Sequence, residues 1–153
     1  ALNWQLSFHL ATASFSLADY QTTQRILIDW SERGQDLSPE ALLILDLARA
    51  MLGKQVDHQS TRATLNQLLP SSNRYVGFYP VVNLLTEEPD WEWISSQIDQ
   101  LAQVDLQSPT QRFYTQRALD LLSECLARDF AENPQATELA NRVRALTLND
   151  EGL

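Results

Sequence analysis

The side chains that could act as nucleophiles, proton-transfer groups or metal ligands are few and widely spaced in this chain. It has two histidines, His9 and His58, and one cysteine, Cys125. The histidines lie far apart in the sequence, and neither belongs to a His-Glu-x-x-His motif or an equivalent ligand spacing. We therefore expect His9 on a helix and His58 in a loop, without a catalytic role for either.

Cys125 continues an apolar helical stripe with Leu121 and Leu122. This position predicts a small buried hydrophobic residue, and the adjacent Glu124 would raise the pKa of its thiol rather than activate it. Because the chain has no second cysteine, an intrachain disulfide is excluded. This is the usual state of a cytoplasmic protein, which we expect slightly ahead of a periplasmic one.

An acidic segment with two tryptophans has the most unusual local composition. Glu88, Asp90 and Glu92 could supply oxygen ligands, but they lack the spacing of a calcium loop. Acidic residues are also favoured in the first turn of a helix, where they meet the positive end of its dipole. The four glycines are isolated, so no phosphate-binding loop is present. The sequence predicts no catalytic residue, no metal site and no cofactor.

The charge of the chain narrows the classes of partner. It has 153 residues and a net charge of −9, with 20 acidic and 11 basic residues. Nucleic acids and anionic membranes are bound mainly through Lys and Arg, so we expect direct contact with neither. No apolar run approaches the roughly 20 residues that span a bilayer, which predicts no membrane insertion. Because the chain begins at Ala1 rather than Met, we expect it to be a fragment of a larger protein.

Capping residues and apolar spacing predict an all-α fold. Ser38-Pro39, Ser108-Pro109 and Asn133-Pro134 place a capping side chain directly before a proline, and Glu88-Pro89-Asp90 is a weaker version of this signal. Apolar residues between these points recur at three and four residues, as in Leu10, Ala13 and Leu17, the stripe that we expect to pack. About eight helices are predicted, at roughly 3–17, 20–33, 39–53, 59–69, 73–85, 90–104, 109–130 and 134–147. The fifth contains Gly77 and Pro80 and is expected to be either a broken helix or an extended segment.

Eight helices with short loops are expected to pair into four antiparallel hairpins. Ser38, Ser72 and Ser108 recur every 34 to 36 residues, a period that is typical of stacked helical-hairpin repeats. The run from Leu10 to Trp30 resembles a tetratricopeptide repeat: Ala11 suits the small position of its first helix, Ala18–Tyr20 its turn, and Leu27 a packing position of its second helix. The departures are Thr23, where this family usually has Ala, and Ala18, where it usually has Gly. The second unit, from Pro39 to Pro70, matches more loosely, with a longer turn, and the later units match by period alone. The resemblance implies a single domain over 1–153, a right-handed α-α superhelix, although other α-hairpin arrays remain open.

The inner face of such an array is lined by the first helix of each hairpin. The resemblance implies that the first unit offers Phe8, Thr12 and Phe15, and that the second offers Leu45, Arg49 and Leu52. An apolar groove with one arginine would accept a helix or an extended peptide that carries a carboxylate. Another helix covering the phenylalanines is the alternative. Trp93 lies about 200° around its helix from Trp91 and is expected either to seal a neighbouring hairpin or to act as an exposed aromatic anchor.

These features predict a protein-interaction or scaffold module, without catalysis, that binds a protein or peptide in an apolar groove. A ligand-sensing domain of a multidomain bacterial regulator is the alternative, and an enzyme of unrecognised type is the third hypothesis. An open apolar groove would favour the first hypothesis, and an enclosed pocket with convergent polar groups the second.

Overall fold

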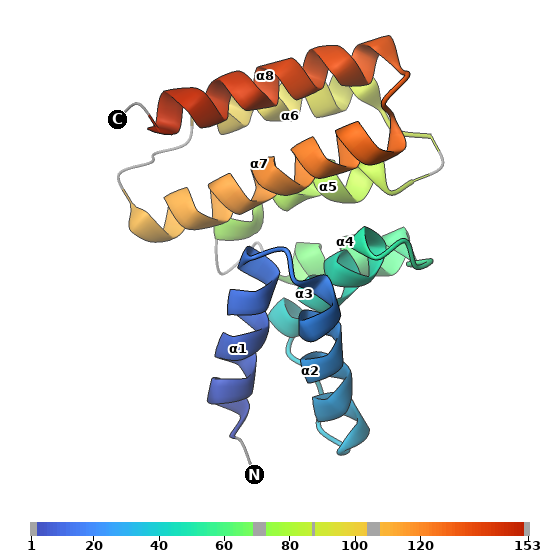
Figure 1. The fold of residues 1–153 in the computed structure, drawn as a ribbon, viewed down its shortest axis with the longest axis vertical. Coiled ribbons are helices and arrows are strands. Elements are labelled where there is room, and N and C mark those ends of the chain that lie inside the picture. Colours follow the sequence, from blue (N-terminus) through green and yellow to red (C-terminus); the bar gives the residue numbers. More distant parts are fainter. Residues whose placement is uncertain (1–2, 69–72, 87, 104–107, 152–153) are drawn as a thin grey trace. The chain divides into compact units, whose positions relative to one another are not determined.

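A computed structural model of the chain describes residues 3–68, 73–86, 88–103 and 108–151. Over these residues the chain forms eight α-helices and one short 3₁₀ helix, with no strand, which confirms the all-α prediction (Figure 1). The chain divides into two compact units, Ala1–Leu68 (unit 1) and Leu69–Leu153 (unit 2). The single domain over 1–153 stays a prediction.

Unit 1 consists of two consecutive helical hairpins. Its helices are α1 (Trp4–Ser16), α2 (Tyr20–Glu32), α3 (Pro39–Met51) and α4 (His58–Leu68). Helix α2 packs against both α1 and α3, α3 packs against α4, and α1 also contacts α3. The first hairpin therefore lies against the first helix of the second hairpin, so α3 has helical neighbours from both hairpins.

The helix starts that capping residues predicted are confirmed. Ser38 and Ser108 accept hydrogen bonds from the backbone N–H groups of Ala41 and Gln111, and Asp90 accepts one from Trp93. Asn133 caps α8 by accepting from Gln135 and Ala136. These bonds satisfy N–H groups that have no partner within the helix. Ser72 and Pro70, which belong to the predicted repeats, lie outside the described residues.

A short internal repeat marks the second helix of each hairpin in unit 1. The sequence Asp-Tyr-Gln-Thr-Thr at 19–23 recurs as Asp-His-Gln-Ser-Thr at 57–61. In both copies the aspartate accepts backbone hydrogen bonds at the helix start. In both copies the last threonine is fully buried, and its hydroxyl donates to the backbone oxygen of that aspartate. The two hairpins thus share local structure as well as order.

The prediction that Leu10, Ala13 and Leu17 form the packing side of α1 is wrong. Leu6 and Leu10 are 45% exposed and Leu17 is 81% exposed, whereas the side chains that α1 buries are Ser7, Ala11, Ser14 and Phe15. Small residues bring α1 and α2 close together: the hydroxyls of Ser14 and Thr23 are 2.7 Å apart, and Thr23 reaches the Ala11 carbonyl at 3.4 Å. Leucines do not fit such a close approach, so they lie on another side of the helix.

Helices α1 and α3 end in the same way. At the end of α1 the N–H of Asp19 donates to the Ser14 carbonyl, and at the end of α3 the N–H of Lys54 donates to the Arg49 carbonyl. This pattern is the Schellman cap, which requires a left-handed residue just before the donor. That residue is Gly53 in α3, with φ +78°, but Ala18 in α1, with φ +61°. The expected departure from glycine at Ala18 therefore places a side chain in a strained conformation.

Unit 2 contains α5 (Phe78–Leu84), α6 (Trp91–Leu101), α7 (Pro109–Asp129) and α8 (Pro134–Glu151), preceded by the 3₁₀ helix η1 (Asn73–Tyr75). Helix α5 packs against α6 and α7, α8 packs against the same two helices, and η1 packs against α7 (Figure 1). The expected helix over 73–85 is indeed broken, into η1 and α5. Pro80 lies in the first turn of α5, where the absence of its N–H costs no helical bond.

The core of unit 2 contains a close contact and a buried thiol. A Cβ at Gly77 would lie 2.9 Å from the Cβ of Ala118, so glycine lets the start of α5 approach α7. Cys125 is fully buried, which confirms its expected place in the apolar stripe.

Candidate functional site

The groove residues expected on α1 differ in their exposure. Phe8 and Thr12 are partly exposed, and the Thr12 hydroxyl donates to the Phe8 carbonyl at 2.8 Å. Phe15 is only 4% exposed, and its ring lies 5.9 Å from that of Tyr20 in an edge-to-face contact. Phe15 is therefore a packing residue here, because a ring so deeply buried offers no surface to a partner.

The groove residues expected on α3 differ in the same way. Leu45 is buried, while Arg49 and Leu52 are partly exposed. The Nε atom of Arg49 is buried and has no hydrogen-bond acceptor among the described residues. Burial raises the pKa of Asp46, one turn earlier, against the opposing effects of a hydrogen bond from Thr61 and the charge of Arg49. Polar groups on this side of α3 are thus partly desolvated.

Three aromatic rings form a continuous cluster on the first hairpin, which we call the aromatic cluster: Trp4, Phe8 and Trp30. The Trp4 ring lies 5.5 Å from Phe8 on the same helix and 5.0 Å from Trp30 on α2. All three residues are partly exposed, although such large rings gain most by full burial. Phe8 was predicted from the sequence as a groove residue, whereas Trp4 and Trp30 were not predicted as site residues. The spacing of Trp4 and Phe8, one helical turn apart, was the signal that could have revealed them.

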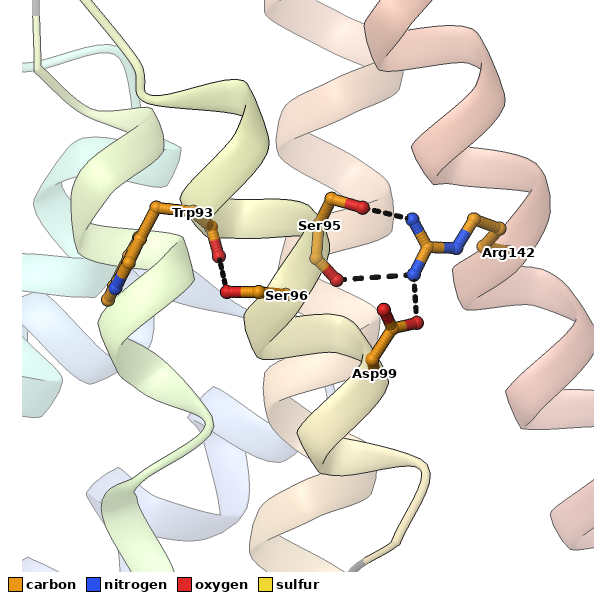
Figure 2. Close-up of polar contacts among 5 residues, drawn as sticks. All are labelled: Trp93, Ser95, Ser96, Asp99 and Arg142. Carbon is orange, nitrogen blue, oxygen red and sulfur yellow. Dashed lines mark hydrogen bonds and ion pairs between the residues drawn. The ribbon is translucent and has the colours of Figure 1, made fainter.

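Trp93 lies on α6, in unit 2, and is partly exposed. Figure 2 shows its indole on the side of α6 away from α8, while Ser95 and Asp99 face α8. Its backbone carbonyl accepts a hydrogen bond from Ser96 at 2.7 Å. Trp93 thus presents part of its ring to solvent, and it belongs to a different unit from the other expected site residues.

A polar cleft of about 270 Å³ lies between α6 and α8, and its wall includes Trp91, Glu92, Glu138 and Arg142. Arg142 donates to the Ser95 carbonyl at 3.1 Å, to the Ser95 hydroxyl and to the Asp99 carboxylate (Figure 2). These three contacts hold the guanidinium against α6. The cleft is smaller than the roughly 300–1,000 Å³ that is usual for small-molecule sites.

The side chains that could act as nucleophiles, proton-transfer groups or metal ligands do not lie close together. His9 lies exposed on α1, and His58 is the first residue of α4 rather than a loop residue. Burial raises the pKa of the Cys125 thiol to about 12, so the thiolate is scarce at neutral pH. Among the described residues there is no group of three His, Cys, Asp or Glu side chains that could hold a metal ion. Within the same part of the chain, no helix is long and apolar enough to cross a membrane.

Comparisons with protein families, with curated proteins and with solved structures found no match for this chain.

Proposed function

We propose that this protein is an interaction module of helical hairpins that binds a peptide or a helix of another protein through the first hairpin. The observation that carries the proposal is the aromatic cluster. Tryptophan and other aromatic rings that are rigid and only partly covered are enriched among residues that dominate protein–protein binding energies. Three such rings in mutual contact offer a preformed apolar surface.

The surroundings of the aromatic cluster support this role. Phe8 and Thr12 share one side of α1, so the apolar surface adjoins a polar group. The repeated hairpin of unit 1, with its tetratricopeptide-like turn and paired caps, holds α1 against two other helices. A rigid helix is a better base for binding residues than a loop, because less order has to be gained on binding.

The proposal is tested by selecting binders from a displayed library of helical and extended peptides, followed by calorimetry. We expect Phe8→Ala to weaken the selected peptides by about tenfold or more, the effect of losing an aromatic hot spot. Phe113→Ala is the matched control, because Phe113 is an exposed aromatic residue on α7, in the other unit. If no peptide is enriched, or if Phe8→Ala and Phe113→Ala act alike, the proposal fails.

Stability separates binding residues from packing residues. Phe8→Ala should cost clearly less than the roughly 3–5 kcal/mol lost when a fully buried phenylalanine is truncated, and Phe15→Ala should approach that cost. A large loss of stability in Phe8→Ala, without a change in peptide affinity, would make Phe8 a core residue.

The cleft between α6 and α8 favours a second candidate function, the binding of a small ligand by a regulatory domain. Its walls combine an indole, two carboxylates and the guanidinium of Arg142, whose charge is paired with Asp99. The indole and the two carboxylates suit a small organic cation. A thermal-shift series with small amines tests this candidate. A stabilisation that is lost in Trp91→Leu would support it, and an unchanged midpoint with every amine would exclude it.

A further inference from the structure

A second surface of α1 is apolar and uncovered in unit 1. Leu6, Leu10, Ala13 and Leu17 lie on one side of the helix at intervals of four, three and four residues, and all four are exposed. We call them the leucine stripe. This spacing is that of the seam between two helices of a coiled coil. The centre of the stripe lies about 170° around α1 from Phe8, so the stripe is distinct from the aromatic cluster.

The second hairpin shows what such a stripe does when it has a neighbour. When the two helices are aligned on their equivalent caps, Ala18 and Gly53, the four positions of the leucine stripe correspond to Ala41, Leu45, Ala48 and Leu52 of α3. The first three of these are buried and the fourth is partly buried. Helices of both hairpins pack against α3. The equivalent stripe is therefore a helix-packing surface, and a helix is the element that suits the stripe of α1.

The charge of the chain indicates which helix can approach. Helix α1 contains no Asp, Glu, Lys or Arg, although the whole chain carries a net charge of −9. Two copies of so acidic a protein repel each other over most of their surfaces. An uncharged helix with an exposed leucine seam is a place where two copies can meet without facing carboxylates.

The order of side chains in the stripe is also complementary to itself. When two copies of α1 run antiparallel, Leu6 faces Leu17 of the other copy, and Leu10 faces Ala13. Large residues then lie opposite small ones at the centre, the arrangement that fills space, whereas a parallel pair would set Ala13 against Ala13 and leave a gap. We propose that the chain self-associates into a two-fold dimer through an antiparallel pair of α1 helices, packed along the leucine stripe.

Such a dimer is expected to be weak. Three exposed leucines and one alanine form a smaller apolar core than stable interfaces have, since these bury roughly 800 Å² on each partner. We expect a dissociation constant between about 10 µM and 1 mM. Salt should strengthen association, because it screens the repulsion between two acidic chains, whereas it would weaken a dimer built from ion pairs.

Sedimentation equilibrium of the full chain tests the proposal. At low micromolar concentration the mass should be that of the monomer, 17.4 kDa, and it should rise towards twice this value as the concentration increases. Leu10→Glu should weaken dimerisation at least tenfold, since it sets a carboxylate in the seam. Phe113→Glu, on an exposed residue of α7, and Phe8→Ala, in the aromatic cluster, should leave it unchanged. These residues are all exposed or partly exposed, and circular dichroism confirms that each variant stays folded.

A charge exchange tests the antiparallel order. Leu6→Glu and Leu17→Lys should each weaken the dimer, and the two together should restore it, because each glutamate then faces a lysine of the other copy. A chain that stays monomeric at 1 mM would overturn the proposal, as would a dimer indifferent to Leu10→Glu. A double variant no stronger than its singles would overturn the antiparallel pairing. Peptide binding at the aromatic cluster does not depend on any of these outcomes.

Discussion

Exchanging alanine and glycine at the ends of α1 and α3 provides a direct test of the paired caps. Ala18 adopts φ +61° at the position that Gly53 occupies in α3. A left-handed conformation costs a residue with a Cβ about 1–2 kcal/mol. Glycine relieves this strain but loses more backbone entropy on folding, by roughly 0.5–1 kcal/mol. We therefore expect Ala18→Gly to stabilise the protein by about 0.5–1 kcal/mol.

Gly53→Ala is the matched reverse change. A Cβ at Gly53 would meet no atom within 4 Å, so the substitution introduces conformational strain without a clash. It should destabilise the protein by about the amount that Ala18→Gly gains.

Urea unfolding followed by circular dichroism at 222 nm measures both variants. The midpoint should rise for Ala18→Gly and fall for Gly53→Ala, with the slope against urea unchanged because the same surface is exposed on unfolding. If Ala18→Gly lowered the midpoint, the strain at Ala18 would be smaller than the extra backbone entropy that glycine loses on folding. The reasoning from the paired caps would then be refuted.

Two further substitutions and one labelling experiment test other features of the structure. Gly77→Ala should destabilise unit 2 by about 1–3 kcal/mol, because its Cβ would come within 2.9 Å of Ala118; an unchanged urea midpoint would contradict this close contact. Asp46→Asn should raise the urea midpoint at pH 7. The pKa of Asp46 is raised in the folded state, so its contribution to stability is full below the unfolded pKa of 3.8 and is lost as the pH rises through the folded pKa. The gain in midpoint should therefore vanish near pH 3, and an equal gain at pH 3 and pH 7 would exclude this cause. Cys125 should react with a thiol reagent at pH 8 only as fast as the protein unfolds, and labelling within seconds in the native state would contradict its burial.

Helix positions could be predicted closely because their signals are local. A capping oxygen and a proline act within one turn, so Ser38, Ser108 and Asn133 predicted helix starts without any knowledge of packing. The break in the fifth helix was open to prediction for the same reason, since Gly77 and Pro80 act on their own backbone. The repeat at 19–23 and 57–61 was also present in the sequence, and comparing the chain with itself would have revealed it.

Which side of α1 packs could not be predicted from hydrophobicity. The leucine stripe is the more apolar side, but α2 approaches through Ala11 and Ser14, where the hydroxyls of Ser14 and Thr23 meet. A close approach of two backbones favours small residues over large ones, and this preference depends on the partner helix. Phe15 was likewise expected in a groove from its place on α1 alone. Its burial against Tyr20 depends on the turn between α1 and α2, which the pattern of one helix does not contain.

The aromatic cluster depends on two helices at once. The spacing of Trp4 and Phe8 is visible in one helix, but the contact with Trp30 requires the antiparallel pairing of α1 with α2. Sequence patterns within one helix do not contain that contact.

The proposed function is tested most directly by amide-resolved NMR of the ¹⁵N-labelled chain, titrated with a peptide that binds in a Phe8-dependent manner. Chemical shifts should change along α1, from Trp4 to Ser16, and at the indole N–H groups of Trp4 and Trp30. Signals of α7 and α8 should stay in place. Changes confined to α6 and α8, around Trp91, would contradict binding at the first hairpin and would assign the function to the cleft of unit 2.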